Sequence, residues 1–452
     1  MARTRRGPVV WWTVVLAMTA GCAGTGGDGR GAATPGASHA VPDERPDYTG
    51  VPKWTPRTTQ EARGEVRTRP DGERIQVRYK GWSTKDFSAF RTYAYDDTRP
   101  GLPVQKVTMP PGLAGDPREG RKLFLSRQIG PCTGCHLIPG DDVWPAGSVG
   151  PDLSTIGDRN LPDAYLYQQI HDIRTVFPQS AMPAWGTAGI LKPEQIAHLV
   201  AFLQTLRGPL PPEKDPDRNP FTRKKPVGFG DNLDPTNNPA VLLAESAEGL
   251  WSAKGPAGKS CADCHRGGVE MAMRGVATRY PRYVKAYKRV MSIEDFLTVH
   301  APETTGREMP AQSADNLDMT MLVKMQSNGM PVAVDLASPE ARAALARGKA
   351  SFLRRVGQRN HACADCHTPE KGANKFLGGR LLGDVGDGLT KHFPTWRTSQ
   401  TQVWDMRKRM QWCMTPLGAN MLPADAIEYA ELELYLTSFD QGKPISVPGI
   451  RH

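Results

Sequence analysis

The sequence predicts a mainly α-helical protein made of three small helical domains that are joined by Pro-rich linkers. Two observations lead to this fold class. A Cys-x-x-Cys-His motif occurs three times in the 452 residues, and each copy lies between two segments that carry the signals of helix starts. The length suits roughly two to four domains. The 40 Pro and 46 Gly predict many turns and long connections between the packed parts.

The composition excludes two classes of protein. The chain has a formal charge of +10, but its Lys and Arg form no stripe interleaved with aromatic residues, so we expect no nucleic-acid partner. Only 39% of the residues are apolar, and no stretch reaches the roughly 20 apolar residues of a membrane-spanning helix. The body of the chain is therefore expected to be soluble.

Residues 1–22 have the form of a secretory signal, with a basic start, a short apolar run and small residues before Cys22. Residues 19–22 (TAGC) resemble the lipobox of bacterial lipoproteins, although Thr19 stands where Leu is usual. We expect an exported, periplasmic protein that is tethered to a membrane through a lipid on Cys22. Simple cleavage, with Cys22 lost or left free, is the alternative.

Residues 23–103 are predicted to form a tether and an N-terminal extension. Up to residue 47 the segment is rich in Gly, Ala and Pro and has too little apolar content to fold. After residue 47, the alternation of Ile75, Val77 and Tyr79 predicts one or two strands or an extended arm. The sequence assigns no function to this extension.

Six of the eight cysteines belong to the three motifs, and these are Cys132, Cys135, Cys261, Cys264, Cys363 and Cys366. Each pair places two thiols one helical turn apart, as attachment of a c-type haem requires, and the next residue supplies an axial imidazole. These imidazoles belong to His136, His265 and His367. Zinc sites and redox-active dithiols also use paired Cys, but neither needs a His after every pair. The sequence thus predicts three covalently attached c-type haems in class I cytochrome c-like domains.

Helix signals surround each motif in the same order. The opening helices are predicted to start at Asp116-Pro117, with Glu119 completing a capping box, at Asn238-Pro239 and at Ser338-Pro339. The first is expected to run into Cys132. The closing helices are predicted to start at Lys192-Pro193, to lie within 313–328 and to start at Leu422-Pro423. We therefore predict haem domains at 104–207, 238–335 and 336–452, with a Pro-rich linker at 208–237.

Each haem needs a second axial ligand or an open site. Met182 lies 46 residues after His136 and directly before a Pro, so this loop Met is the predicted ligand of the first haem. His171 and His198 are weaker rivals, because both lie within helical patterns. In the middle domain His300 follows 35 residues after His265 and predicts a haem with two His ligands. Met309 is its rival, and a surface position for His300 is the plain alternative.

Cys413 also lies 46 residues after the motif His of its domain and is expected to bind the third haem as a thiolate. An inert buried thiol or an intermolecular disulfide is the alternative. Residues 404–413 have a helical pattern, so Arg409 would share a face with Cys413, favour the thiolate and attract an anionic substrate. Arg407 points elsewhere on such a helix and is expected to be a solvated surface charge.

At these residues the chain resembles the SoxAX cytochromes of sulfur-oxidising bacteria, with the two subunits fused. Residues 104–207 resemble SoxX at 130–140 (GPCTGCHLIPG), 149–153 (VGPDL), Met182-Pro183 and Trp185-Gly186. Residues 238–452 resemble SoxA at 238–240 (NPA), 280–283 (YPRY), 289–291 (RVM), 407–413 (RKRMQWC), Glu428-Tyr429 and 431–436 (ELELYL). The sequence departs from the family in its His300, where a Cys ligand is usual, and in the fusion itself.

The resemblance implies an L-cysteine S-thiosulfotransferase that is haem-dependent. Such an enzyme oxidatively conjugates thiosulfate to a cysteine of the carrier protein SoxYZ and passes two electrons to an acceptor cytochrome c. Cys413 matches the family's active-site haem ligand, which is carried as a persulfide. Because an anionic thiolate favours ferric iron, electrons should flow from the Cys413 haem towards the Met182 haem. A thiosulfate dehydrogenase that forms tetrathionate and a non-catalytic multihaem electron carrier are the alternatives.

Overall fold

The computed structural model describes residues 45–51, 64–68, 75–79, 87, 89–126, 132–225 and 237–451. The predicted signal and lipid site at residues 1–22 lie outside the described residues. Strands β1 (Gly64–Thr68) and β2 (Ile75–Tyr79) pair antiparallel, with Val66 opposite Val77. This hairpin confirms the strand that the alternating run predicts. None of the helices in the described ranges has the length and apolar character needed to cross a membrane.

The first haem motif lies between two helices, as predicted. The α-helices are α1 (Pro117–Leu125), α2 (Asp163–Asp172) and α3 (Pro193–Thr205), and short 3-10 helices occupy Cys132–Gly134, Ile156–Arg159, Ile173–Thr175 and Pro216–Arg218. Asp116 caps α1 by accepting a hydrogen bond from the backbone N–H of Arg118. The prediction that this helix runs into Cys132 is wrong, because the backbone leaves the helical region at Ser126, with ψ of 117°.

The middle part of the chain contains five α-helices and one hairpin. They are α4 (Ala240–Ser252), α5 (Cys261–Cys264), α6 (Gly268–Met273), a 3-10 helix (Val276–Arg279), β3 (Arg282–Val284), β4 (Arg289–Met291), α7 (Ile293–Thr305) and α8 (Ala314–Met325). Helix α8 confirms the closing helix predicted within 313–328. Strands β3 and β4 pair antiparallel, with Tyr283 opposite Val290.

The C-terminal part combines four α-helices with two small sheets. Its elements are α9 (Pro339–Leu353), α10 (Cys363–His367), β5 (Phe376–Leu377), β6 (Arg380–Leu381), a 3-10 helix (Val385–Asp387), β7 (Thr395–Arg397), β8 (Gln402–Trp404), α11 (Met406–Leu417), α12 (Ile427–Ser438) and β9 (Gly449–Arg451). Strand β7 pairs antiparallel with β8 and parallel with β9. Helix α12 starts four residues after Pro423, because Ala426 N–H bonds the Pro423 carbonyl in a turn first.

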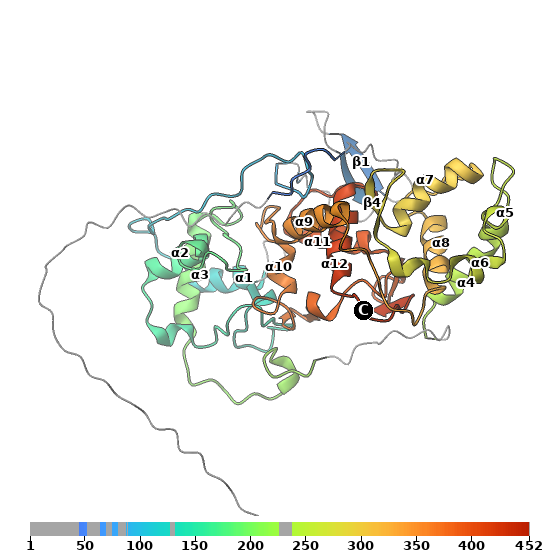
Figure 1. The fold of residues 1–452 in the computed structure, drawn as a ribbon. Coiled ribbons are helices and arrows are strands. Elements are labelled where there is room, and N and C mark those ends of the chain that lie inside the picture. Colours follow the sequence, from blue (N-terminus) through green and yellow to red (C-terminus); the bar gives the residue numbers. More distant parts are fainter. Residues whose placement is uncertain are drawn as a thin grey trace, which may run out of the picture. The chain divides into compact units, whose positions relative to one another are not determined.

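In each part the opening helix packs against the closing helix: α1 on α3, α4 on α8 and α9 on α12 (Figure 1). Two glycines allow the first and third of these crossings. A Cβ on Gly120 would overlap the backbone carbonyl of His198 in α3, and one on Gly348 would overlap that of Glu431 in α12. The repeated order of opening helix, haem motif and closing helix is therefore a repeat in space as well as in sequence.

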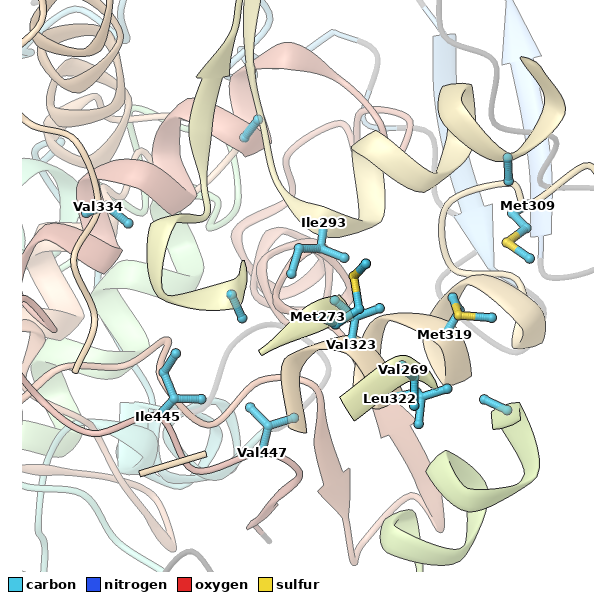
Figure 2. Packing of buried hydrophobic residues seen from close by; sticks show 14 of the residues in the cluster. Val269, Met273, Ile293, Met309, Met319, Leu322, Val323, Val334, Ile445 and Val447 are labelled. Carbon is cyan, nitrogen blue, oxygen red and sulfur yellow. The ribbon is translucent and has the colours of Figure 1, made fainter. Parts of the chain in front are cut away.

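The middle and C-terminal parts share a hydrophobic core. Buried residues of the middle part, such as Ile293 and Leu322, cluster with Leu434 of α12 and with Ile445 and Val447 near the end of the chain (Figure 2). Helix α9 begins directly at Ser338-Pro339, with no Pro-rich linker before it. The expectation of separate modules therefore does not describe these two parts, which are held together by a common apolar interior.

Candidate active site at the third haem motif

The cysteines of the first and third motifs are half-buried free thiols. Burial raises the pKa of Cys132 to about 12 and that of Cys135 to about 11, and it raises the pKa of Cys363 and Cys366 to about 12. Cys132 borders the hydrophobic cluster of the first part, and Cys363 borders two clusters of the third. Neutral thiols against apolar surfaces suit the attachment of a large apolar ring.

The motif histidines of these two sites are oriented for metal binding. His136 Nδ1 lies 2.9 Å from the Pro151 carbonyl oxygen, and His367 Nδ1 lies 2.8 Å from that of Gly383. A proton held on Nδ1 by a carbonyl leaves Nε2 with its lone pair, as an axial ligand requires. Burial lowers the pKa of both imidazoles and keeps them neutral.

The structure brings together the two histidines predicted as ligands of the middle haem. The ring centroids of His265 and His300 are 6.2 Å apart, which leaves room for one atom bonded to both rings. Phe296 stacks on His300 at 4.7 Å, and burial lowers the His300 pKa. The rival Met309 is 1% exposed within the shared hydrophobic core. The pair therefore fits a bis-His site better than a His–Met site.

Met182 borders the same hydrophobic cluster as Cys132. Its two rivals lie on helices and have other partners. His171 of α2 lies within 3.2 Å of the Gln105 side-chain oxygen, and His198 of α3 accepts a hydrogen bond from the Asp116 N–H. Met182 and Cys132 thus pack against one cluster, and ligation of the first haem by Met182 stays a prediction.

Cys413 lies on α11 close to both cysteines of the third motif. Burial is the main cause of the raised pKa of Cys366, and the charge of Cys413 is the second cause. The charge of Cys413 also raises the pKa of Cys363. Helix α11 is capped by Asp405, which accepts a hydrogen bond from the Lys408 N–H at 2.6 Å. Cys413 therefore lies near the third motif, and its binding to the third haem stays a prediction.

Arg409 faces the same site. Its Nη1 atom is buried and has no hydrogen-bond partner in the described part of the chain. Its charge contributes to the lowered pKa of His367, after burial. A buried guanidinium N–H without an acceptor costs free energy unless an anion binds it. The donor set therefore fits an anionic group, either a haem propionate or a substrate.

Three further arginines that the sequence analysis missed complete a basic cluster with Arg409: Arg380 of β6, Arg397 of β7 and Arg451 of β9. Burial, followed by the charges of the other three arginines, lowers the pKa of Arg397 to about 10, and Cys413 opposes this shift. Trp412 lies between Arg380 and Arg409, with its centroid 4.6 and 5.0 Å from the two guanidinium carbons. Arg397 and Arg451 are register partners on neighbouring parallel strands, so two cationic side chains come from adjacent strand positions.

The expectation that Arg407 is a surface charge is wrong. The residue is 0% exposed and forms ion pairs of 2.7 Å with Asp295 and 2.8 Å with Glu433, with Glu294 at 3.7 Å. Burial alone would lower its pKa, but these carboxylates raise it above the ordinary value. A helical wheel gives the direction of a side chain and not what packs there, and here the middle part covers that face of α11.

The first and third motifs lie against each other. The Gly378 N–H donates to the Gly134 carbonyl at 2.7 Å, and Ser148 exchanges two hydrogen bonds with Phe376. Burial, Cys413 and Asp365 raise the pKa of Cys366 most, and the charge of Cys135 raises it further. The two haem attachment sites are therefore adjacent across this junction.

Comparison with known proteins finds related cytochromes. Two family models match: the SoxA/TsdA cytochrome c domain over residues 246–332, and the cytochrome c oxidase cbb3-type subunit III over residues 115–203. The L-cysteine S-thiosulfotransferase subunit SoxA of Pseudaminobacter salicylatoxidans is 31% identical over 216 residues, which cover 47% of this chain and 73% of the relative. The chain belongs to the SoxA family. The SoxA subunit of Paracoccus pantotrophus is 30% identical over 221 residues, with coverage of 48% and 73%.

Solved structures add two further similarities. The SoxXA structure from Paracoccus pantotrophus shares 30% identity, with a TM-score of 0.44 and coverage of 48% of this chain and 80% of the other. Thiosulfate dehydrogenase (TsdBA) from Marichromatium purpuratum shares 18% identity, with a TM-score of 0.19 and coverage of 74% and 70%.

SoxA-family membership confirms the resemblance seen at residues 238–452 and the predicted class, an L-cysteine S-thiosulfotransferase of the SoxA type. The two matched models identify cytochrome c domains, which bind c-type haem covalently. The model over residues 115–203 is that of the cbb3-type subunit III, so the likeness of that region to SoxX stays a prediction.

Proposed function

We propose that this chain oxidatively conjugates thiosulfate to a cysteine of a SoxYZ-type carrier and passes the two electrons to an acceptor cytochrome c. The observation that supports this most is that Cys413 lies near both the third haem motif and the basic cluster. Three c-type haems would be held by the three Cys pairs. Their axial ligands would be His136 with Met182, His265 with His300, and His367 with Cys413.

The reaction joins the outer sulfur of thiosulfate to the carrier thiol. One S–S bond forms, the thiol loses its proton, and two electrons leave. The Arg409, Arg397 and Arg380 side chains would bind the thiosulfate dianion and hold it beside Cys413. Cys413 would bond to the outer sulfur of thiosulfate as two electrons leave, and the carrier thiol would then take over the intact S–SO3 group while Cys413 departs as the thiol. Haem groups bound at these residues would accept the two electrons that the reaction releases.

The electrons would leave through the first motif. The junction between Gly134 and Gly378, together with the interaction of Cys135 with Cys366, puts the two attachment sites side by side. A neutral Met ligand raises the reduction potential above that of a thiolate-ligated haem. We therefore propose transfer from the Cys413 site to the Met182 site and then to the soluble acceptor. We also propose export to the periplasm and lipid tethering through Cys22.

The test is a turnover assay with thiosulfate and oxidised cytochrome c, with and without a carrier protein. We expect cytochrome reduction to require the carrier. The carrier cysteine should gain the mass of one thiosulfate anion, less the proton that its own thiol loses. Cys413→Ser should reduce the rate by at least 100-fold. Tetrathionate formed without the carrier would instead support a thiosulfate dehydrogenase, and unchanged turnover by Cys413→Ser would refute the proposal.

Matched variants on α11 test the anion site. Arg409→Met removes a buried cation that faces Cys413 and should raise the KM for thiosulfate more than 10-fold. Lys408→Met removes the neighbouring charge, which is hydrogen-bonded to Gln402 at the surface, and should leave the KM within about twofold. Equal effects of the two substitutions would show that the net charge of the helix matters and not the site.

A further inference from the structure

The described part of the N-terminal extension contributes to the interior of the third haem domain. Residues 89–99, called here the arm, contain five buried side chains: Arg91, Thr92, Tyr93, Ala94 and Asp97. Tyr93 and Ala94 belong to a hydrophobic cluster with Met414 of α11 and Tyr429 of α12, and Cys363 packs against it. The arm precedes both segments that match family models.

Three hydrogen bonds fix the arm on either side of Tyr93. The Arg91 carbonyl accepts from the Gly357 N–H at 2.9 Å, and the Asp97 carbonyl accepts from the Arg354 guanidinium at 2.9 Å. Between them, the Tyr95 N–H donates to the Glu428 carboxyl at 2.8 Å. The position of Tyr93 is therefore set by the loop before the third motif and by α12.

The phenol of Tyr93 touches the haem attachment site. Its oxygen lies 3.2 Å from the Cys363 sulfur. Burial raises the pKa of Tyr93 well above its ordinary value. The charge of Cys363, the hydrogen bond between Tyr93 and Cys363, and the charge of Cys413 raise this pKa further. The phenol is therefore protonated at neutral pH. A thioether sulfur has no proton to give, so after haem attachment at Cys363 only the phenol can donate in this contact.

We propose that Tyr93 is a positioning residue of the third haem site, and that its hydroxyl donates to the Cys363 thioether and raises the reduction potential of the Cys413-ligated haem. This rests on haem attachment and Cys413 ligation at the third motif, and not on the identity of the substrate. A donor whose positive end points at the haem edge favours the reduced state, because it stabilises the added electron. The arm would thus be part of the redox site and not only its cover.

The test is a redox titration of the full-length holoprotein, with each haem followed by its own visible and paramagnetic resonance signals. Tyr93→Phe keeps the ring that packs against Met414 and removes only the hydroxyl. We expect the midpoint of the thiolate-type haem to shift downward while that of the Met182-type haem stays unchanged. Tyr95→Phe, which preserves the backbone bond to Glu428, is the control and should leave both midpoints unchanged.

The outcomes separate this inference from the proposed function. A wild-type protein without a thiolate-type signal would refute the Cys413 ligation on which both depend. A thiolate-type signal that Tyr93→Phe leaves in place, or that shifts together with every other haem, would overturn only the role of Tyr93. Haem counting by mass in both variants verifies that the sites being compared are loaded.

Discussion

Arg407 contributes to stability at a place where the sequence predicts a surface charge. Its removal would leave Asp295 and Glu433 buried without a cation. We expect Arg407→Met to lower the free energy of unfolding by about 3–5 kcal/mol, the usual effect of breaking a buried ion pair. Lys408→Met, on the exposed side of α11, should change it by less than about 0.5 kcal/mol. Urea unfolding at pH 8 measures both, and a small loss for Arg407→Met would contradict the buried cluster.

Glu428 gives the protein a pH-dependent stability. Burial raises its pKa from 4.5 to about 7, although the Tyr95 N–H opposes the shift. Between these two pH values the folded chain keeps a proton that the unfolded chain releases, so stability falls as the pH rises through this window. The raised pKa corresponds to roughly 3 kcal/mol.

Glu428→Gln should remove this slope, because the amide oxygen still accepts from Tyr95 and no charge is buried at high pH. The measurement is the free energy of unfolding of both proteins from pH 4.5 to 8. We expect the wild type to lose stability relative to the variant across that range. Parallel curves for the two proteins would show that the carboxyl ionises normally in the fold.

Glycine substitutions can test how closely the opening and closing helices pack in each part. Gly120→Ala puts a methyl group into the backbone of α3, so the two helices must separate, and we expect a loss of about 1–3 kcal/mol. Gly249 lies in α4, the corresponding helix of the middle part, and has no atom near its missing side chain. Gly249→Ala should therefore stabilise the protein by up to about 1 kcal/mol. Thermal unfolding distinguishes the opposite signs.

The elements also show what could be predicted from the sequence. Asp116-Pro117 and Ser338-Pro339 define helix starts because capping and the fixed φ of Pro act locally. His300 was identifiable from its place before the closing helix, and the structure sets it against His265. The pairing of Arg397 with Arg451 was not identifiable, because their strands are more than 50 residues apart in the chain. Arg380 lies in a separate hairpin and joins them only through tertiary packing.

The whole molecule is expected to carry three haems, a number that intact mass measures directly. The native protein should show three haem increments, and an alkylating reagent applied after unfolding should label Cys413 but none of the motif cysteines. Labelling of Cys261 and Cys264 would show that the middle motif is empty. The same spectra would show an additional sulfur on Cys413 and acyl chains on Cys22.

At the scale of the whole chain, the sequence shows the three repeated motifs. It does not show which distant segments pack against them. The alternation at Ile75 indicated strands, and nothing in residues 89–99 pointed to the third haem. Hydrophobic pattern identifies an element that needs a partner and does not identify which partner it finds. The shared core around Ile445 and Leu322 was hidden for the same reason.

Tyr93 and Cys363 are separated by 270 residues along the chain. Synthesis therefore produces the phenol long before the sulfur that it contacts, and the whole first domain is made in between. Contacts of such long range form late, because the ends of a long loop must first meet. The contact between the arm and the third motif is therefore expected to form late in folding, and a product truncated before Cys363 would lack it.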